Sequence, residues 1–280
     1  MAYSTISKPW LHFNNKLYTG NGSTQSITGV GFQPDFTWIK GRSATYNNGL
    51  YDAVRGVTKR IVSNNNNAED TRADALTAFG TDGFTLGTDS QVNANTATYA
   101  SWNWKANGQG SSNTDGSINT TYTSVNSTAG FSISTYTGTG SNATFGHGLG
   151  VKPAMFIIKR LSDTEDWAVY HQGLGASYYH NLNTNAAQQS NNRWNGEPTT
   201  SLINLQSHAA VNGNGDTYVC YAFAEKKGYS AFGKYRGNAN SNGTFIYTGF
   251  KPAFVLIKET TDVGAWRIYD SKRGQGGDNV

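Results

Sequence analysis

The chain has 280 residues, room for two domains of ordinary size; only 14% are charged, 13% are aromatic, and scattered basic residues give a net charge of +4. The densest basic pairs, Lys59-Arg60 and Lys226-Lys227, are too small to track phosphates, which excludes a nucleic-acid partner, and the single Cys220 excludes an intrachain disulfide. No apolar run approaches the roughly 18 residues of a membrane span, and residues 1–10 lack the apolar core of a signal peptide, so we expect synthesis in a cytoplasm.

Short aromatic and β-branched runs alternate with Gly and Asn along the whole chain. This punctuation is typical of β-strands joined by tight turns. No window of about 12 residues combines helical periodicity with caps, so little helix is expected. The sequence therefore predicts an all-β fold.

The chain begins with a short polar leader, residues 1–11, which is a natural anchor to a larger particle. A first module follows over residues 12–106. Its organising strand, Phe36–Lys40, comes directly after Pro34-Asp35 and is apolar on both faces, which indicates a central strand packed on two sides. The proline has no N–H and so belongs at the strand's start, whereas the lysine at the other end can place its ammonium group in water.

The same text is written three times, over residues 32–40, 151–159 and 250–258. Each copy has a proline, an apolar run and a lysine, followed 11 residues later by a tyrosine. In the first and third copies an Asp and an Arg follow that tyrosine in the same frame, whereas the middle copy has His171 at the Asp position. The recurring positions are Pro34, Lys40, Tyr51, Asp52 and Arg55; Pro153, Lys159 and Tyr170; and Pro252, Lys258, Tyr269, Asp270 and Arg273.

Repetition in a fixed frame favours a structural role for these positions, because a fold needs the same staple in each copy. We interpret the Asp–Arg pair as one that fixes a turn. The alternative is a ligand clamp, since Arg and a carboxylate can both grip sugar hydroxyls.

A second strand pattern closes each complete module. Thr98–Trp104 and Thr217–Phe223 each place large side chains on one face, which predicts a strand with its aromatic face on a core. In a third module the equivalent segment would fall beyond Val280. We therefore expect the chain to be a fragment of a longer protein; the alternative is that another chain covers the exposed edge.

These elements divide the chain into tandem β-sandwich, jelly-roll-like modules, two complete and a third partial. Residues 107–130, rich in Gly, Ser, Asn and Thr, are expected to be a linker or a long surface loop. The second module then covers residues 131–228, and the partial third covers residues 229–280.

Several blocks resemble modules in virion proteins of tailed phages, particularly marine and cyanobacterial ones. They include Gly31–Arg42, Tyr51–Gly56, Tyr99–Trp104, Tyr221–Tyr229 and Trp266–Gly274. The resemblance covers nearly the whole chain. It implies a concanavalin-like jelly-roll module in a tail fibre or other virion appendage, with host-surface binding as its usual role and no catalytic residue.

The residues themselves do not favour an enzyme. Glycoside hydrolysis needs two carboxylates about 5–9 Å apart, yet no glutamate recurs in frame between the complete modules. The histidines show no metal-ligand spacing, and there is no phosphate-binding loop. The acidic segment 163–166 could hold calcium, although an exposed acidic loop explains it better. We predict no catalytic, cofactor-binding or metal-binding residue.

Four side chains in amide-rich text, Tyr178, Tyr179, His180 and Trp194, are candidates for ligand contact. Aromatic rings beside amides suit sugar faces, but the same rings could equally plug the ends of a sandwich. We predict a non-enzymatic virion structural protein, part of a tail fibre or appendage that supports host attachment. Expected partners are other virion proteins, through the N-terminal region, and further copies, with a trimer favoured. Alternatives are a lectin for a host-surface glycan and, less favoured, a polysaccharide depolymerase.

Overall fold

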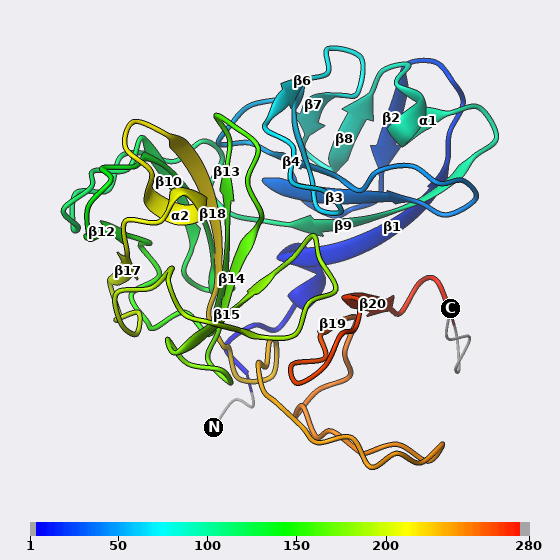
Figure 1. Ribbon diagram of the computed structural model, residues 1–280. Coiled ribbons are helices and arrows are strands. Elements are labelled where there is room, and N and C mark those ends of the chain that lie inside the picture. Colours follow the sequence, from blue (N-terminus) through cyan, green and yellow to red (C-terminus); the bar gives the residue numbers. More distant parts are fainter. Residues whose placement is uncertain (1–3, 275–280) are drawn as a thin grey trace.

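The computed structural model describes residues 4–274 and shows an all-β protein with 37% strand and 4% helix, as predicted (Figure 1). All strand pairs between named strands are antiparallel. A short 3-10 helix, η1 (Pro9–Leu11), precedes the first strand.

Strands β1 to β9 form a first layered unit, unit 1. A six-stranded sheet in the order β1-β9-β3-β4-β5-β6 lies against a three-stranded sheet in the order β2-β8-β7, and one turn of helix, α1 (Ser90–Asn93), precedes β9. The strands are β1 (Phe13–Thr19), β2 (Gln25–Thr28), β3 (Phe36–Gly41), β4 (Gly49–Asp52), β5 (Lys59–Val62), β6 (Asp70–Thr71), β7 (Leu76–Gly80), β8 (Gly83–Leu86) and β9 (Thr98–Trp104).

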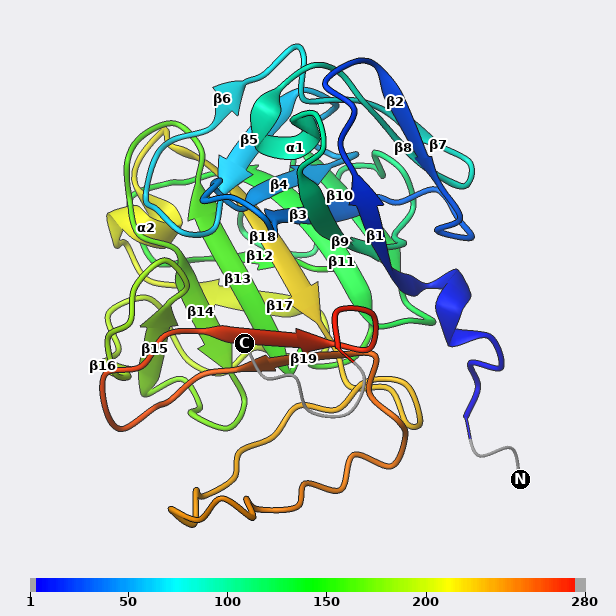
Figure 2. The same ribbon diagram turned by 90° about the vertical axis from the view of Figure 1, so that its right-hand side faces the viewer.

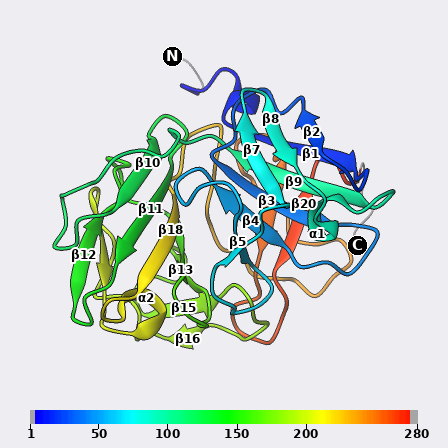
Figure 3. The same ribbon diagram turned by 90° about the horizontal axis from the view of Figure 1, so that it is seen from above.

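Strands β10 to β18 form a second layered unit, unit 2, beside the first (Figure 3). Its seven-stranded sheet has the order β10-β11-β18-β13-β14-β15-β16, and β12 pairs with β17; α2 (Ala209–Asn212) precedes β18 as α1 precedes β9. The strands are β10 (Tyr122–Asn126), β11 (Phe131–Thr137), β12 (Ala143–Gly146), β13 (Met155–Arg160), β14 (Ala168–His171), β15 (Tyr178–Asn181), β16 (Gln189–Ser190), β17 (Leu202–Leu205) and β18 (Thr217–Phe223).

The stretch 107–130 is not wholly a linker or surface loop, contrary to the prediction. Residues Tyr122–Asn126 form β10 and pair with β11, and Ile118 is buried in the core of unit 2. The buried side chains of β10 are hydroxyls: Thr123 Oγ1 lies 3.1 Å from Ser134 Oγ on β11. Because paired hydroxyl side chains take the place of apolar ones in β10, its sequence looks like that of a flexible linker.

The two organising strands are central, as predicted. β3 lies between β9 and β4, and β13 lies between β18 and β14. Alternate residues of β3 enter different cores: Ile39 is buried within unit 1, whereas Phe36 and Trp38 enter a core shared by both units. Strand β3 is therefore apolar on both faces because one face packs inside its own unit and the other packs against a neighbouring unit.

The third copy is a hairpin of β19 (Phe254–Ile257) and β20 (Arg267–Asp270). Figure 2 shows it in front of the lower part of the unit 2 sheet and below unit 1, with the segment before β19 projecting away from the body. Phe254 and Leu256 of β19 pack against the shared core. The hairpin thus occupies the place of a third unit's β3–β4 pair.

Equivalent hydrogen bonds join successive copies. The repeat spacing is 119 residues from Lys40 to Lys159 and 99 from Lys159 to Lys258. With these offsets, three bonds between units 1 and 2 recur between unit 2 and the hairpin segment. The first set is Trp167 Nε1 to Val62 O, Glu165 N to Asn66 O and Glu69 N to Leu161 O, each 3.0 Å; the second is Trp266 Nε1 to Asn181 O (2.9 Å), Gly264 N to Asn185 O and Gln188 N to Thr260 O (both 2.8 Å).

A further repeated contact closes the arrangement into a ring. Tyr221 of unit 2 donates its hydroxyl to Asp52 Oδ2 of unit 1 at 2.6 Å. In unit 1 the counterpart of Tyr221 is Trp102, which donates Nε1 to Asp270 Oδ2 of the hairpin at 3.1 Å. Each copy thus contacts both others around one shared apolar core.

Candidate functional site

The recurring Asp–Arg pair forms a buried turn staple in unit 1. Asp52 accepts hydrogen bonds from the amides of Val54 (3.1 Å) and Arg55 (2.8 Å) and from Arg55 Nε (2.6 Å). Burial disfavours the charged guanidinium, but Asp52, Tyr221 and Glu69 together outweigh it and raise the pKa of Arg55. The pair is held almost entirely out of water, with side-chain exposures of 0% for Asp52 and 2% for Arg55.

The hairpin carries the same staple. Asp270 accepts from the amides of Lys272 and Arg273, both at 2.9 Å, and from Arg273 Nε. The Arg273 guanidinium also lies over the Trp102 ring, 4.9 Å from its centroid. This geometry leaves neither carboxylate free to grip a sugar, so it does not favour the alternative ligand clamp.

The lysines that end the organising strands differ in burial. Lys40 and Lys258 are partly exposed, but Lys159 is fully buried and donates Nζ to Arg160 O at 2.6 Å. The expectation that each ammonium reaches water is therefore wrong for Lys159. Burial lowers the pKa of Lys159 to about 8.

The four candidate ligand-contact residues lie together, but mostly inside unit 2. Trp194 is 1% exposed; its ring packs edge-on against Phe156 at 4.9 Å, and its Nε1 donates to Tyr178 O at 3.2 Å. Tyr179 and His180 lie on strand β15 rather than in a loop, and both are buried. Only Tyr178, at 38%, is substantially exposed. A sugar-stacking role needs an open ring face, so the interpretation that these rings fill the sandwich describes Trp194 and Tyr179 better.

The acidic segment 163–166 mainly accepts hydrogen bonds from neighbouring residues. The two carboxylate oxygens of Asp166 accept from the side-chain amides of Asn181 (3.0 Å) and Asn183 (2.7 Å). Among residues 4–274 no group of three or more His, Cys, Asp or Glu side chains is arranged to hold a metal ion.

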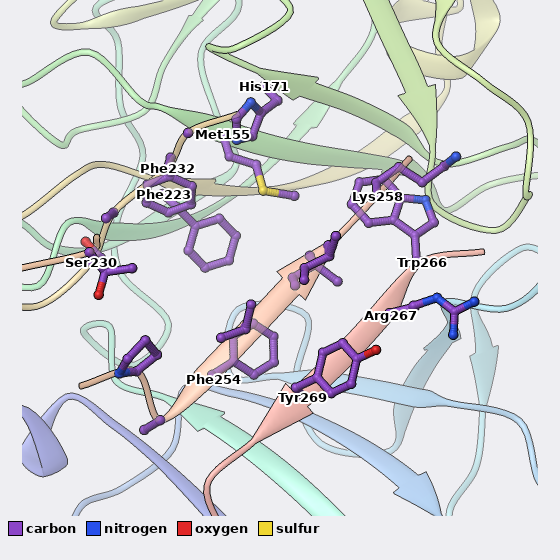
Figure 4. A pocket seen from close by; sticks show the side chains of 18 of the residues that line it. Met155, His171, Phe223, Ser230, Phe232, Phe254, Lys258, Trp266, Arg267 and Tyr269 are labelled. Atoms are coloured by element: carbon purple, nitrogen blue, oxygen red, sulfur yellow. The ribbon is translucent and has the colours of Figure 1, made fainter. Parts of the chain in front are cut away.

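A cavity of about 1750 Å³ lies between the hairpin and the adjoining faces of units 1 and 2 (Figure 4). Met155 and Phe223 line it from the β13–β18 face, and Phe254 lines it from β19. The rest of its apolar wall includes Phe232, Trp266 and, from unit 1, Phe36 and Trp104. We call this space the groove. It suits apolar and aromatic groups, and sequence patterns could not reveal it because it exists only through the ring arrangement.

Two histidines add polar atoms to the groove. His171 occupies the position that is Asp52 in unit 1 and Asp270 in the hairpin, and its Nδ1 accepts from Gly173 N at 2.9 Å. His180 lies beside Trp266, with ring centroids 5.9 Å apart, and neither of its ring nitrogens has a hydrogen-bond partner among the described residues. Burial lowers the pKa of both, to about 4 for His180, so both are neutral at pH 7.

The fold and the groove define an all-β repeat protein whose copies associate face to face. The chain belongs to a family described as "Domain of unknown function (DUF7483)", whose model matches residues 8–279. No curated protein and no solved structure matches the chain. Within residues 4–274, none of the helices has the length and apolar character needed to cross a membrane.

Proposed function

We propose that the protein is a non-enzymatic structural component of a phage virion, part of a tail fibre or other appendage that supports attachment to the host surface. The observation that carries the proposal is the set of three hydrogen bonds repeated between successive copies. Further copies of the chain, in a trimer, and other virion proteins at the N-terminal region are the proposed partners.

The repeated hydrogen bonds support a structural role because side chains that recur in the copies make them. Trp167 and Trp266 each hold one copy to the end of a strand in the preceding copy. Asp52 and Asp270 likewise receive a donor from another copy. Reuse of one interface around a closed ring gives a compact three-copy body, which suits a structural part of an appendage.

The resemblance to tailed-phage virion modules supports the same proposal independently of the contacts. The lectin alternative has less support from the geometry, since Trp194, its expected stacking ring, is 1% exposed. A depolymerase gains no specific support from the described side chains.

Mass spectrometry of particles tests the proposal. Phage particles from a lysate of infected host cells would be purified on a density gradient, and peptides of this chain should rise and fall with infectivity at a constant ratio to the capsid protein. A phage-encoded soluble enzyme serves as the control that should not follow the particles. Recovery of the chain only in the soluble fraction would overturn the proposal.

A further inference from the structure

Strand β19 has a free edge where the equivalent strands have a partner. β3 pairs with β4 on one side and β9 on the other, and β13 pairs likewise with β14 and β18. Among residues 4–274, β19 pairs with β20 alone. Its second edge faces the groove, which Phe254 and Leu256 help to line.

Two more segments of the third copy lack the partners that their equivalents have. In unit 2, Phe131 on β11 pairs with Phe223 on β18, whereas the corresponding aromatic segment of the third copy, Phe232–Tyr235, is irregular. β2 pairs with β8 in unit 1, and β12 pairs with β17 in unit 2. The corresponding segment of the third copy, residues 244–247, forms no strand. Phe245 and Tyr247 there are 85% and 81% exposed. Within residues 4–274 all three segments therefore lack the kind of partner strand that β8 and β9 supply in unit 1 and that β17 and β18 supply in unit 2.

The groove also lies where a repeated inter-copy contact would fall. In unit 1 the Asp52 carboxylate meets Tyr221 of the next copy, whose ring stacks on Phe36 at 4.3 Å. The equivalent residues of unit 2 are His171 and Met155, and both line the groove. No aromatic side chain of a closing strand fills this place among the described residues, although the two other interfaces each have one.

We propose that the groove binds an extended polypeptide strand, antiparallel to β19, with large aromatic side chains at alternate positions as in β9 and β18. Its main chain would extend the β19–β20 pair by β-augmentation, and its aromatic face would enter the groove. The occupant is a polypeptide strand from outside residues 4–274, not a small apolar ligand and not the face of a second copy. The proposal does not depend on the virion assignment.

His171 sets the chemistry of the central contact. Because Nδ1 accepts from the Gly173 amide, the neutral ring carries its proton on Nε2 and offers a donor. Asp52 and Asp270 instead offer acceptors. A Tyr at the central position of the incoming strand can accept from Nε2, whereas a Trp, which only donates, cannot. The groove should therefore prefer the β18 pattern to that of β9.

Peptide binding to the full 280-residue chain tests the proposal. The probe is a fluorescein-labelled peptide with the sequence of Thr217–Phe223 and Cys220→Ser, measured by fluorescence anisotropy. The control has the same composition, with neighbouring residues exchanged so that the aromatic side chains move to the opposite face. We expect saturable binding of the probe at least tenfold tighter than that of the control. Equal binding of the two peptides, or no binding of the probe at its solubility limit, would overturn the proposal.

A groove-filling variant and amide exchange locate the binding. Met155→Trp should weaken probe binding at least tenfold without lowering the unfolding midpoint, because it fills the groove from unit 2.

Amide exchange identifies the edge that binds the probe. The amide of Arg42 donates to Thr98 O, and in an antiparallel pair every second amide of a strand points to the same neighbour, so the Trp38 amide also faces β9. Leu256 is the equivalent of Trp38 in the third copy, so its amide should face the probe. Its hydrogen exchange should slow on binding. Unchanged exchange at Leu256, or light scattering that shows a dimer which excludes the probe, would contradict the proposed occupant.

Discussion

Asp52 shows how one side chain serves a turn and an interface together. Its Oδ1 accepts the amides of Val54 and Arg55, which fixes the turn after β4. Its Oδ2 accepts Arg55 Nε and the Tyr221 hydroxyl, which ties the turn to unit 2. The carboxylate therefore contributes to local structure and to association of the units.

Asp52→Ala should lower the free energy of unfolding by about 3–5 kcal/mol, because it leaves the buried Arg55 without its main counter-charge. Tyr221→Phe removes the hydrogen bond that the hydroxyl donates to Asp52 and the long one that it accepts from Arg55, but it keeps the ion pair, so a loss of about 1–2 kcal/mol is expected. Urea unfolding followed by tryptophan fluorescence measures both. Asp270→Ala is the matched control: Arg273 is 26% exposed, so the loss should be smaller. Equal losses for the two Asp variants would contradict this account.

Lys159 should make stability depend on pH above neutrality. Its pKa is about 8 in the folded chain and 10.5 in the unfolded one, so between these values the unfolded chain binds more protons and stability rises with pH. Relative to Lys159→Met, the wild type should carry a penalty of roughly 3 kcal/mol at pH 7 that falls to about half by pH 9.5. Urea unfolding of both proteins at the two pH values measures it. A difference that does not change with pH would show that Lys159 keeps its ordinary pKa.

The sequence allowed the recurring residues to be recognised but not the contacts between copies. Pro34, Tyr51 and Asp52 stand in a fixed frame, and that frame by itself predicts a structural role. The hydroxyl that Asp52 accepts belongs to Tyr221 in the next unit, and no local spacing encodes which copy lies opposite. For Trp194 the sequence left open whether the ring contacts a ligand or fills the end of a sandwich, and the fold shows that it is buried.

At the scale of elements, periodicity succeeded where apolar side chains form the pattern and failed where hydroxyls do. β3 and β13 were predicted as central strands because both of their faces are apolar. β10 has the burial of a strand but buries Thr123 and Ser124. Glycines around it suggested a flexible linker, yet Gly110 and Gly116 lie where the backbone of a neighbouring strand passes closely.

Gly110 and Gly108 provide a matched test of whether the segment before β10 is packed or free. Both have positive φ, +73° and +59°, so alanine at either should cost on the order of 1–2 kcal/mol of backbone strain. A Cβ at Gly110 would lie 2.2 Å from Thr123 O, whereas one at Gly108 meets nothing within 4 Å. Gly110→Ala should therefore cost a further ~1–3 kcal/mol in urea unfolding. Equal stability of the two variants would indicate a free linker.

At the scale of the whole molecule, the ring makes the stability of the parts unequal. Units 1 and 2 each have a core of their own in addition to the shared one. The β19–β20 pair has only its docked face, and an isolated two-stranded hairpin is at best marginally stable in water. Its structure therefore depends on contacts such as Trp266 Nε1 to Asn181 O and Trp102 Nε1 to Asp270 Oδ2.

Two equivalent tryptophans separate these levels of stability. Trp167 is fully buried between units 1 and 2, and its Nε1 lies within hydrogen-bonding distance of Val62 O and Asn65 O, so Trp167→Ala should lower the main unfolding transition by about 3–5 kcal/mol. Trp266→Ala removes the equivalent contact of the hairpin. It should speed amide exchange in β19 and β20 while leaving the main transition within about 0.5 kcal/mol, because local opening of the hairpin leaves the two units intact. Hydrogen–deuterium exchange with mass spectrometry and urea unfolding measure the two effects. If Trp266→Ala lowers the main transition as much as Trp167→Ala does, the hairpin is an integral part of one cooperative ring.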